Sequence, residues 1–457
     1  MIKKKYIYNI FSIFLVSHLT IWTLIPYFSN INLPLDTIEH LAWASNLDWG
    51  FDKHPPLVAF ILAIFYQIFS NQDWAYYLLS QIFVVSTFYI VWIFSKEFFK
   101  NDLYSLISVL LLEGLFFYNF TTPEFNVNIC QLPFWALTVF YFWRSIKDNE
   151  IKNWILLGLF AGLGFLSKYL FAYLLMSLAA FLIYILFRKR NLKINIVISV
   201  ITFLIIISPH IFWLIKNDFV SILYALKRTG LETTNLKNHF INPLIFLGKQ
   251  IGVLFPLFLI FLMSLKKPII KFKFRDQKFL FLLVINLMPI VLMTITSLIS
   301  GAKIRTMWMT PFYLYWGVML VYLFQKNINL LNLRNFFYMF LIFFTISPIS
   351  YFYISKQYDQ KRTDYPGKEI AYLVQQKWDK NFRNDISVIV GDEWIGGNLS
   401  YHLNSRPKWF RSLDGEIEKI NPDAGFVYAG NPKVLKKICP GVFGTIKPVG
   451  FCMIGIK

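Results

Sequence analysis

The sequence predicts an α-helical membrane protein with many spans, followed by a small α/β domain. Two observations lead to this fold class. Of the 457 residues, 56% are hydrophobic and only 15% are charged, whereas soluble domains carry about 25% charged residues. Many stretches also reach the ~20 consecutive apolar residues that a helix needs to cross a bilayer. Residues 355–457 differ, because they are polar and interrupted by Gly and Pro.

The basic residues indicate on which side of the membrane the loops lie. The formal net charge is +20, and lysines and arginines cluster in short loops between apolar stretches, at 3–5, 188–193 and 266–278. Such clusters mark cytoplasmic loops, so we read the charge as a membrane orientation and expect no nucleic-acid partner. The lysines at 3–5 precede a long apolar stretch without a small-residue cleavage site, which predicts an uncleaved first span.

With the basic loops inside, about eleven spans are expected, the N-terminus inside and the C-terminus outside. The apolar stretch 57–70 has only about 14 residues and would upset this alternation, so it is expected to be re-entrant or interfacial. The expected spans are residues 6–28, 76–95, 104–120, 127–143, 154–167, 169–187, 194–213, 244–265, 279–300, 307–325 and 336–354. Residues 1–354 would therefore form the transmembrane domain.

Residues 355–457 are expected to form the α/β domain on the outer face. Two short runs, 386–390 and 425–430, have the composition of strands, and 369–378 has the spacing of an amphipathic helix. Of the three cysteines, Cys439 and Cys452 would be able to pair if this region lies outside the cytoplasm. The cysteine spacing matches no metal-ligand pattern, and the sequence leaves the pairing open.

This arrangement places the unusual polar residues on the outer side. Ionisable residues at membrane depth are costly, and their default interpretation is functional. Their common side predicts one site at the outer membrane interface. The set comprises Asp36, Glu39, Lys53, His54, Glu124, Lys168, His210, Lys216, Asp218, Arg228, Lys303 and Arg305.

Asp36 and Glu39 are the strongest catalytic candidates. They are three residues apart, which places both carboxylates on one face of a helix. A hydroxyl nucleophile needs a base within hydrogen-bond reach, and a second acid nearby would hold a divalent metal ion or orient the acceptor. The structural alternative is that Asp36 caps an interfacial helix and Glu39 completes an arrangement like a capping box. The two interpretations are compatible.

The other candidates also have structural alternatives. Lys53, in the turn KHPP, would extend its ammonium to the interface. Lys168 would be a charge at a helix end, although it follows small residues that let helices approach closely. His210 would be a hydrogen-bonded histidine at a helix end, and Glu124 a charge at a helix N-terminus. Each of these residues is weak evidence for a site when taken alone. Their common position on the outer side of the membrane is the stronger argument.

At this point a family resemblance can be given. Residues 36–57, DTIEHLAWASNLDWGFDKHPPL, resemble the first extracytoplasmic loop of the GT-C fold glycosyltransferases that use polyprenyl-phosphate sugars. The resemblance is to the bacterial branch related to protein O-mannosyltransferases and the aminoarabinose transferase of lipid A. TTPEFN (121–126), GLGFLSKY (162–169), residues 208–228 and KIRTMWMTPFY (303–313) are similar to further stretches of that family.

Two departures from the family pattern stand out. Glu124 occupies a turn where the family usually has Asp, so a role that demands the shorter acid is in doubt. Thr37 follows Asp36 where the family often has adjacent Asp and Glu, which leaves Glu39 as the close partner.

The resemblance implies a GT-C type transmembrane domain with interfacial helices, in a bacterial inner membrane, with its active site facing the periplasm. The implied reaction transfers a sugar, with inversion, from a polyprenyl-phosphate donor to lipid A, another glycan or a protein. Asp36 would deprotonate the acceptor hydroxyl, and Glu39 and Glu124 would orient the acceptor or a divalent ion. Substrate-binding candidates, mainly for the donor phosphate, are Lys53, His54, Lys168, His210, Arg228, Lys303 and Arg305.

Two other functions compete with this interpretation. A lipid-linked glycan transporter or flippase would need polar residues along a path from both sides, and the middle of the expected spans is nearly free of charge. A scaffold subunit without catalysis would not need Asp36 and Glu39. The sequence does not settle the sugar, the acceptor, metal dependence or oligomeric state.

Overall fold

The computed structural model describes residues 4–187, 193–229, 235–266, 274–329, 332–357, 360–413, 423–446 and 449–457. The chain divides into two compact units. The helical unit comprises Met1–Ile25, Trp49–Pro55 and Leu78–Tyr353, and the α/β unit comprises Pro26–Asp48, Pro56–Tyr77 and Ile354–Lys457. The α/β unit thus takes in two N-terminal segments besides the C-terminal part of the chain.

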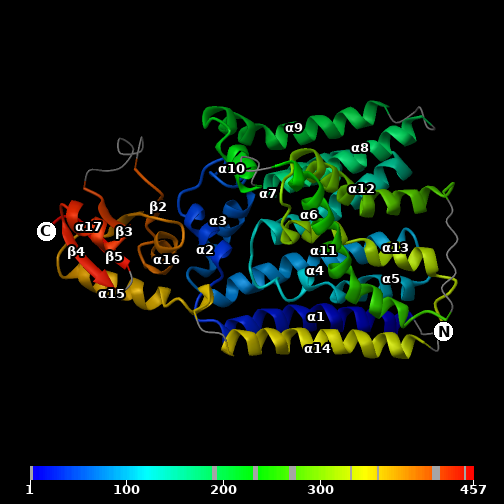
Figure 1. The fold of residues 1–457 in the computed structure, drawn as a ribbon, viewed down its shortest axis with the longest axis horizontal. Helices are drawn as coiled ribbons and strands as arrows, with labels where there is room; N and C mark the ends of the chain where they lie inside the picture. The colour runs from blue at the N-terminus through cyan, green and yellow to red at the C-terminus, as the bar shows by residue number, and fades with distance from the viewer. Residues whose placement is uncertain are drawn as a thin grey trace. The chain divides into compact units, whose positions relative to one another are not determined.

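Long apolar helices build the helical unit (Figure 1). They are α1 Lys4–Ser29, α4 Asp73–Lys96, α5 Asp102–Leu110, α6 Val127–Asp148, α7 Ile151–Ser167, α8 Ala172–Leu186, α9 Lys193–Lys216, α10 Val220–Arg228, α11 Leu236–Leu262, α12 Gln277–Ser300, α13 Trp316–Phe324 and α14 Leu333–Gln357. The 3₁₀ helices are η1 Leu111–Gly114, η2 Phe116–Tyr118, η3 Tyr169–Phe171 and η6 Thr306–Tyr313. α1 and α14 run side by side, with Trp22 against Tyr351 and Phe14 against Phe340.

Seven described helices are long and apolar enough to cross a membrane, and the bent pair η6–α13 adds an eighth if it is one span. Eleven spans were expected. Of the other three, 104–120 is divided into α5, η1 and η2, and α7 has only 17 residues. α6 has 22 residues but ends with Arg144, Lys147 and Asp148, which lowers its apolar content. The fold class, a polytopic helical protein with a small sheet domain, is confirmed.

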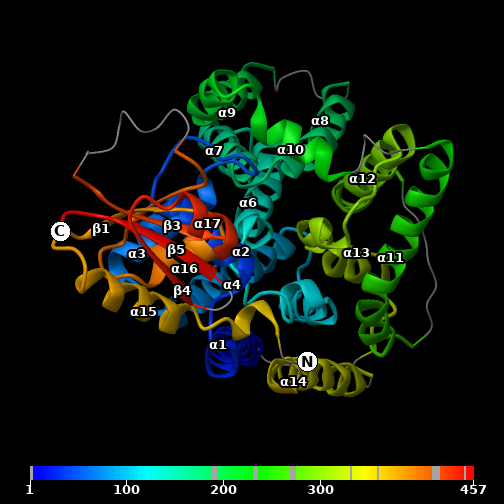
Figure 2. The same ribbon diagram turned by 60° about the vertical axis from the view of Figure 1, so that its left-hand side comes forward.

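Small residues bring α7 and α9 together, and Figure 2 shows the two helices side by side. Gly158 lies against the backbone of Ser199 and the side chain of Thr202, and Gly162 lies against Ile206. A Cβ atom at Gly158 would meet the Ser199 carbonyl oxygen, closer than any real contact. The small residues noted in the sequence therefore serve close helix packing.

The α/β unit contains a mixed five-stranded sheet, in the order β2-β1-β3-β5-β4. The strands are β1 Ile386–Val390, β2 Lys408–Phe410, β3 Gly425–Gly430, β4 Val442–Ile446 and β5 Val449–Ile454. β1 pairs in parallel with β2 and β3, and β5 pairs antiparallel with β3 and β4. The runs 386–390 and 425–430 are thus strands, as the sequence predicted.

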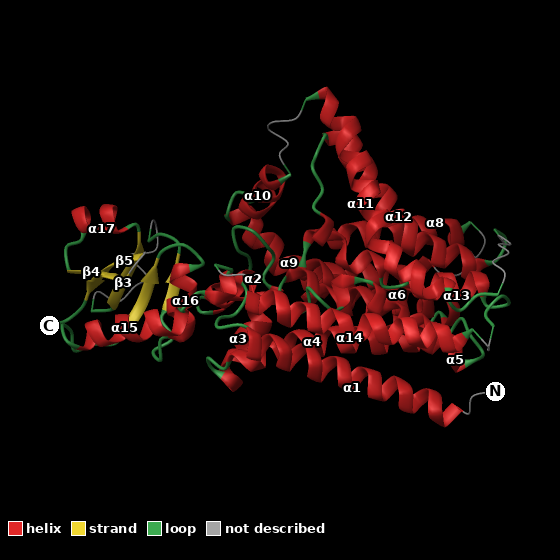
Figure 3. Cartoon of the chain, turned by 60° about the horizontal axis from the view of Figure 1, so that its bottom comes forward, coloured by secondary structure: helices red, strands yellow, loops and turns green. Residues whose placement is uncertain are grey.

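Helices accompany this sheet in the same unit. They are α2 Leu35–Ala44, α3 Leu57–Phe69, η7 Arg362–Asp364, α15 Gly367–Asp379, α16 Ile395–His402 and α17 Pro432–Ile438. Figure 3 shows α15 below and α17 above the yellow strands. The expected helix at 369–378 lies within α15. The stretch 57–70 forms the 13-residue helix α3, and its interfacial position stays a prediction.

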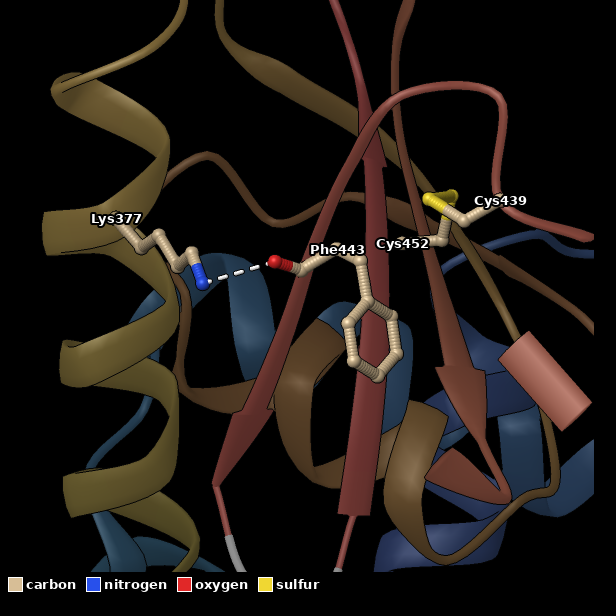
Figure 4. The surroundings of a disulfide bond; sticks show 4 residues. All are labelled: Lys377, Cys439, Phe443 and Cys452. Carbon is tan, nitrogen blue, oxygen red and sulfur yellow. Dashed lines mark hydrogen bonds between the residues drawn. A yellow bond between two sulfur atoms is a disulfide. The ribbon is translucent and has the colours of Figure 1, made fainter. Parts of the chain in front are cut away.

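A disulfide joins Cys439, which follows α17, to Cys452 in β5 (Figure 4). β4 and β5 form an antiparallel hairpin. On the other side of this hairpin, Lys377 of α15 donates a hydrogen bond from Nζ to the carbonyl oxygen of Phe443, at 3.1 Å. Cys130 is the remaining cysteine and is a buried free thiol. The pairing that the sequence left open is therefore Cys439 with Cys452.

Candidate functional site

The predicted site residues are divided between the two units. Asp36 and Glu39 lie on α2 in the α/β unit. The other candidates belong to the helical unit, and there the structure gathers them into three local groups. The groups are Lys53, His54 and His210; Glu124 and Lys168; and Arg228, Lys303 and Arg305.

Both candidate catalytic carboxylates lie in the first half of α2. The helix begins after Pro34, which is its N-cap and makes no side-chain capping bond. Asp36 lies in the first turn, where a carboxylate interacts favourably with the helix dipole, and is partly exposed. Glu39 follows one turn later and is 9% exposed. The capping-box interpretation is wrong because Pro34, not Asp36, occupies the N-cap.

The turn that contains Lys53 and His54 packs against α9 and α10. Phe51 donates its backbone N–H to the carbonyl of His54 at 3.1 Å, which closes the turn. Gly50 lies against the ring of Trp213, where no side chain would fit. The Lys53 ammonium lies 5.9 Å from the ring centre of Tyr224 on α10. The prolines and glycine of this segment thus set the position of a lysine.

His210 is the residue that anchors this turn. Its Nδ1 lies 2.6 Å from the carbonyl oxygen of Trp49, and its Nε2 lies 2.9 Å from the hydroxyl of Tyr169. Because a carbonyl only accepts, Nδ1 carries the hydrogen and Nε2 accepts from the tyrosine. The Tyr169 oxygen then accepts from Ser221 at 2.6 Å. His210 is fully buried and both ring nitrogens are engaged, which favours a positioning role over direct substrate binding.

Glu124 and Lys168 each contact an asparagine at the N-terminus of α6. Asn126 caps this helix by accepting from the backbone of Asn128 at 2.9 Å, and its amide lies 3.5 Å from a Glu124 oxygen. Lys168 is 5% exposed and donates to the side-chain oxygen of Asn128 at 2.5 Å. Its ammonium lies 5.8 Å from the ring centre of Trp308. These contacts place a buried ammonium beside the N-terminus of α6, where the helix dipole is positive.

Arg228, Lys303 and Arg305 come from two segments that lie side by side. The backbone N–H of Lys303 donates to the carbonyl of Thr229 at 3.2 Å, directly after α10. All three basic side chains are exposed. Arg228 also ends α10, where a cation complements the helix dipole. This group is positioned to contact an anion from solvent or a lipid headgroup.

Several residues around these groups were not among the predicted site residues. Asn128, Tyr169, Ser221 and Trp308 are neutral, and neutral polar or aromatic residues are common near membrane interfaces. Only proximity to a charged candidate, such as Asn126-x-Asn128 after Glu124, would have pointed to them. Among the described residues, no group of three or more His, Cys, Asp or Glu side chains is arranged to hold a metal ion.

One ionisable pair lies within the expected spans, in a region that the sequence analysis described as nearly free of charge. His18 Nδ1 of α1 lies 2.6 Å from Glu113 Oε1 of η1, and both side chains are almost completely buried. Asn119 donates to the other oxygen of Glu113 at 3.3 Å and accepts from Ser347 of α14 at 3.1 Å. Together with Asn119, this pair links α1, η1 and α14. It is a structural connection rather than a series of polar groups across the membrane.

Comparisons with known proteins agree with this fold. Residues 53–213 match the dolichyl-phosphate-mannose-protein mannosyltransferase family. The lipid A galacturonosyltransferase RgtD of Rhizobium johnstonii is 21% identical over 308 residues, which cover 66% of this chain and 63% of that protein. The undecaprenyl phosphate-α-4-amino-4-deoxy-L-arabinose arabinosyl transferase of Wigglesworthia glossinidia brevipalpis is 27% identical over 159 residues, 33% of this chain and 27% of that protein. The chain thus matches less than two thirds of the length of each relative.

The structural comparison extends over nearly the whole chain. The crystal structure of ArnT from Cupriavidus metallidurans bound to undecaprenyl phosphate superimposes with a TM-score of 0.66, at 11% identity. The match covers 96% of this chain and 97% of that one. The predicted resemblance is therefore confirmed: this chain has a GT-C fold like that of ArnT, and its residues 53–213 match the dolichyl-phosphate-mannose-protein mannosyltransferase family.

Proposed function

We propose that the protein is an integral-membrane glycosyltransferase that moves a sugar from a polyprenyl-phosphate donor to an acceptor hydroxyl, with inversion at the sugar carbon. The observation that carries the proposal is the pair of carboxylates on α2, Asp36 in the first turn and Glu39 one turn later. The GT-C fold supports the same reaction class, as do the relatives named as a lipid A galacturonosyltransferase and an undecaprenyl phosphate-α-4-amino-4-deoxy-L-arabinose arabinosyl transferase.

In this reaction the acceptor oxygen forms a bond to the sugar carbon as the bond from that carbon to the phosphate oxygen breaks. Asp36 takes the proton of the acceptor hydroxyl, and Glu39 orients the acceptor. The polyprenyl phosphate leaves with the bonding electrons and needs cationic stabilisation. Lys168 is our first candidate for that phosphate because its ammonium is buried, and Lys53 is the second. Arg228, Lys303 and Arg305 are exposed. Their positive charges suit the phosphate groups on the surface of a lipid acceptor.

The acceptor and the location belong to the same proposal. RgtD is named as a lipid A galacturonosyltransferase, so we propose lipid A or a related glycan as the acceptor. The inner membrane, with the site facing the periplasm, is the proposed location. The disulfide between Cys439 and Cys452 supports it, because disulfides persist in oxidising compartments and are rare in the cytosol.

Asp36→Asn tests the proposed base. The amide keeps the size of the side chain but cannot accept the proton, so transfer should fall by about 10²–10⁴-fold. Asp48→Asn is the matched control, because Asp48 is an exposed carboxylate just after α2 and its loss should leave transfer unchanged. The measurement is mass spectrometry of lipid A and other glycans from cells that carry each variant, the wild type or no gene.

Near-normal glycan modification in Asp36→Asn, at wild-type protein abundance, would contradict the assignment of Asp36. Identical lipid A and glycan spectra with and without the wild-type gene would count against the transferase function itself.

A further inference from the structure

The C-terminal part of the α/β unit packs directly on α2. In the middle of the helix, Gly397 of α16 faces Ile38 and Ala42. A Cβ at Gly397 would lie 3.1 Å from Ile38 and 3.2 Å from the Cβ of Ala42. That spacing is tighter than most real contacts, so α16 packs closely on α2 and an added Cβ at Gly397 would press on Ile38 and Ala42. Ile38 and Ala42 are fully buried.

Polar contacts fix the chain just before α2. Asn32 donates from Nδ2 to Asn398 Oδ1 at 2.8 Å, and its own Oδ1 lies 3.2 Å from His402 Nε2. All three side chains are buried. Burial lowers the pKa of His402 to about 4, so the ring is neutral at neutral pH and donates from Nε2 to the asparagine. Two residues of α16 therefore hold the segment from which α2 begins.

The other end of α2 is held by Arg406. The last four carbonyls of a helix have no partner within the helix, and Leu41 carries one of them. Arg406 donates to that carbonyl oxygen at 2.6 Å and to Ser400 at 3.2 Å. Its guanidinium also lies 4.1 Å from the ring centre of Tyr66 on α3. Ser45, the C-cap of α2, accepts a bond from the backbone of Trp409 at 2.8 Å.

Arg406 is held in an unusual backbone conformation. Its φ is +48°, in the left-handed region that non-glycine residues adopt infrequently. The contacts of its side chain with α2, α3 and α16 offset that conformation. Meanwhile the sheet has its own core of Val388, Val390 and Phe410, to which Arg406 does not belong. The arginine therefore serves the attachment of α2 rather than the fold of the sheet.

We propose that Arg406 is a positioning residue of the enzyme and that, with Gly397, it holds α2 so that Asp36 and Glu39 keep a fixed orientation. The C-terminal domain then contributes to turnover through α2. Only the effect on turnover rests on the proposed function; the attachment of α2 by Arg406 does not. Reacting groups lose much of their effectiveness when displaced by about 1 Å, so a loosened α2 should slow the chemical step more than it weakens donor binding.

The test compares Arg406→Gln, Arg406→Lys and Gly397→Ala in the full-length solubilised protein. Lys408→Gln is the control, because Lys408 is exposed and only two residues away. Hydrogen exchange followed by mass spectrometry should show faster exchange in residues 35–44 of Arg406→Gln and Gly397→Ala, and unchanged exchange in β1, β3 and β5. Arg406→Lys should fall between, because it keeps the cation at the end of α2 but loses one of the guanidinium contacts.

Turnover supplies the second readout. In Arg406→Gln, kcat should fall by about 10–100-fold, with a donor KM within about twofold of wild type. The number of undecaprenyl phosphate molecules bound per protein should also stay at the wild-type value, whereas partial unfolding would reduce binding and kcat together. Lys408→Gln should match the wild type throughout.

Unchanged exchange of residues 35–44 in both Arg406→Gln and Gly397→Ala would overturn the proposal, as would faster exchange with full kcat. If Arg406→Gln does not fold, Gly397→Ala and Arg406→Lys decide in the same way. A wild-type protein without any transfer activity would refute the proposed function, while the exchange of α2 would still show whether Arg406 holds this helix.

Discussion

At the scale of single residues, the buried ionisable groups differ in the partners that they contact. His18 and Glu113 face each other, and His210 uses both ring nitrogens within the protein. Lys168 is buried as well and donates to the side-chain oxygen of Asn128. It is the buried cation that we propose binds the donor phosphate.

Lys168→Gln should therefore weaken use of the polyprenyl-phosphate donor. A hydrogen bond to a charged group contributes about 1.5–3 kcal/mol, so the donor KM should rise, or kcat/KM fall, by roughly 10–100-fold. Lys168→Arg should recover part of the loss because it keeps the charge in a different geometry. Initial rates at varied donor concentration give this comparison.

Lys152→Gln is the control for that experiment, since Lys152 is an exposed lysine at the other end of the same helix. Wild-type donor kinetics in Lys168→Gln would remove Lys168 from the phosphate site. Lys53 and the exposed group of Arg228, Lys303 and Arg305 would then be the remaining candidates.

At the scale of elements, the length of an apolar stretch predicts a span correctly where the helix is continuous. Where the helix is broken, the same length misleads. The expected span 104–120 is mostly apolar in sequence, yet it divides into α5, η1 and η2. Glu113 lies at the break and binds His18 of another helix. Such a break depends on a distant partner, which local hydropathy does not contain. Glycine spacing in α7 was more informative, because close helix approach has a local signature.

Gly158→Ala should lower the melting temperature of the solubilised protein. Its Cβ would meet the backbone of Ser199, which cannot rotate away, and overpacking costs about 1–3 kcal/mol. Gly248→Ala is the matched control in α11, because nothing lies within 4 Å of a Cβ there. That change should be neutral or stabilise by about 0.5–1 kcal/mol, since glycine is unfavourable inside a helix. Equal melting temperatures for the two variants would contradict the packing argument for α7 and α9.

At the scale of the whole molecule, the sequence predicts the class of fold and the identity of the charged candidates, but not the partners of α2. Apolar stretches and strand-like runs are local patterns and can be found by inspection. Asn32 and Asn398 meet across 366 positions, and Arg406 reaches Leu41 across 365. Neither contact has a periodic or compositional signal. The division of the chain into units that combine α2 and α3 with residues 354–457 is likewise a product of tertiary packing.

The last prediction concerns the side of the membrane on which this α/β unit lies. α3 has 13 residues and is about 20 Å long at ~1.5 Å per residue, which is short of the ~30 Å hydrocarbon core. If α3 does not cross, Gln72 after it lies on the same side as Lys380 after α15, and both are exposed. Lys152, exposed in the first turn of α7, should lie on the cytoplasmic side.

Single cysteines at these three positions test this arrangement in the wild-type background. Cys130 is buried, and Cys439 and Cys452 are joined, so the introduced thiol should dominate labelling. An impermeant maleimide added to intact spheroplasts should label Gln72→Cys and Lys380→Cys, whereas Lys152→Cys should react only after permeabilisation. Labelling of Gln72→Cys only after permeabilisation would mean that α3 crosses the membrane, which would contradict its predicted interfacial position.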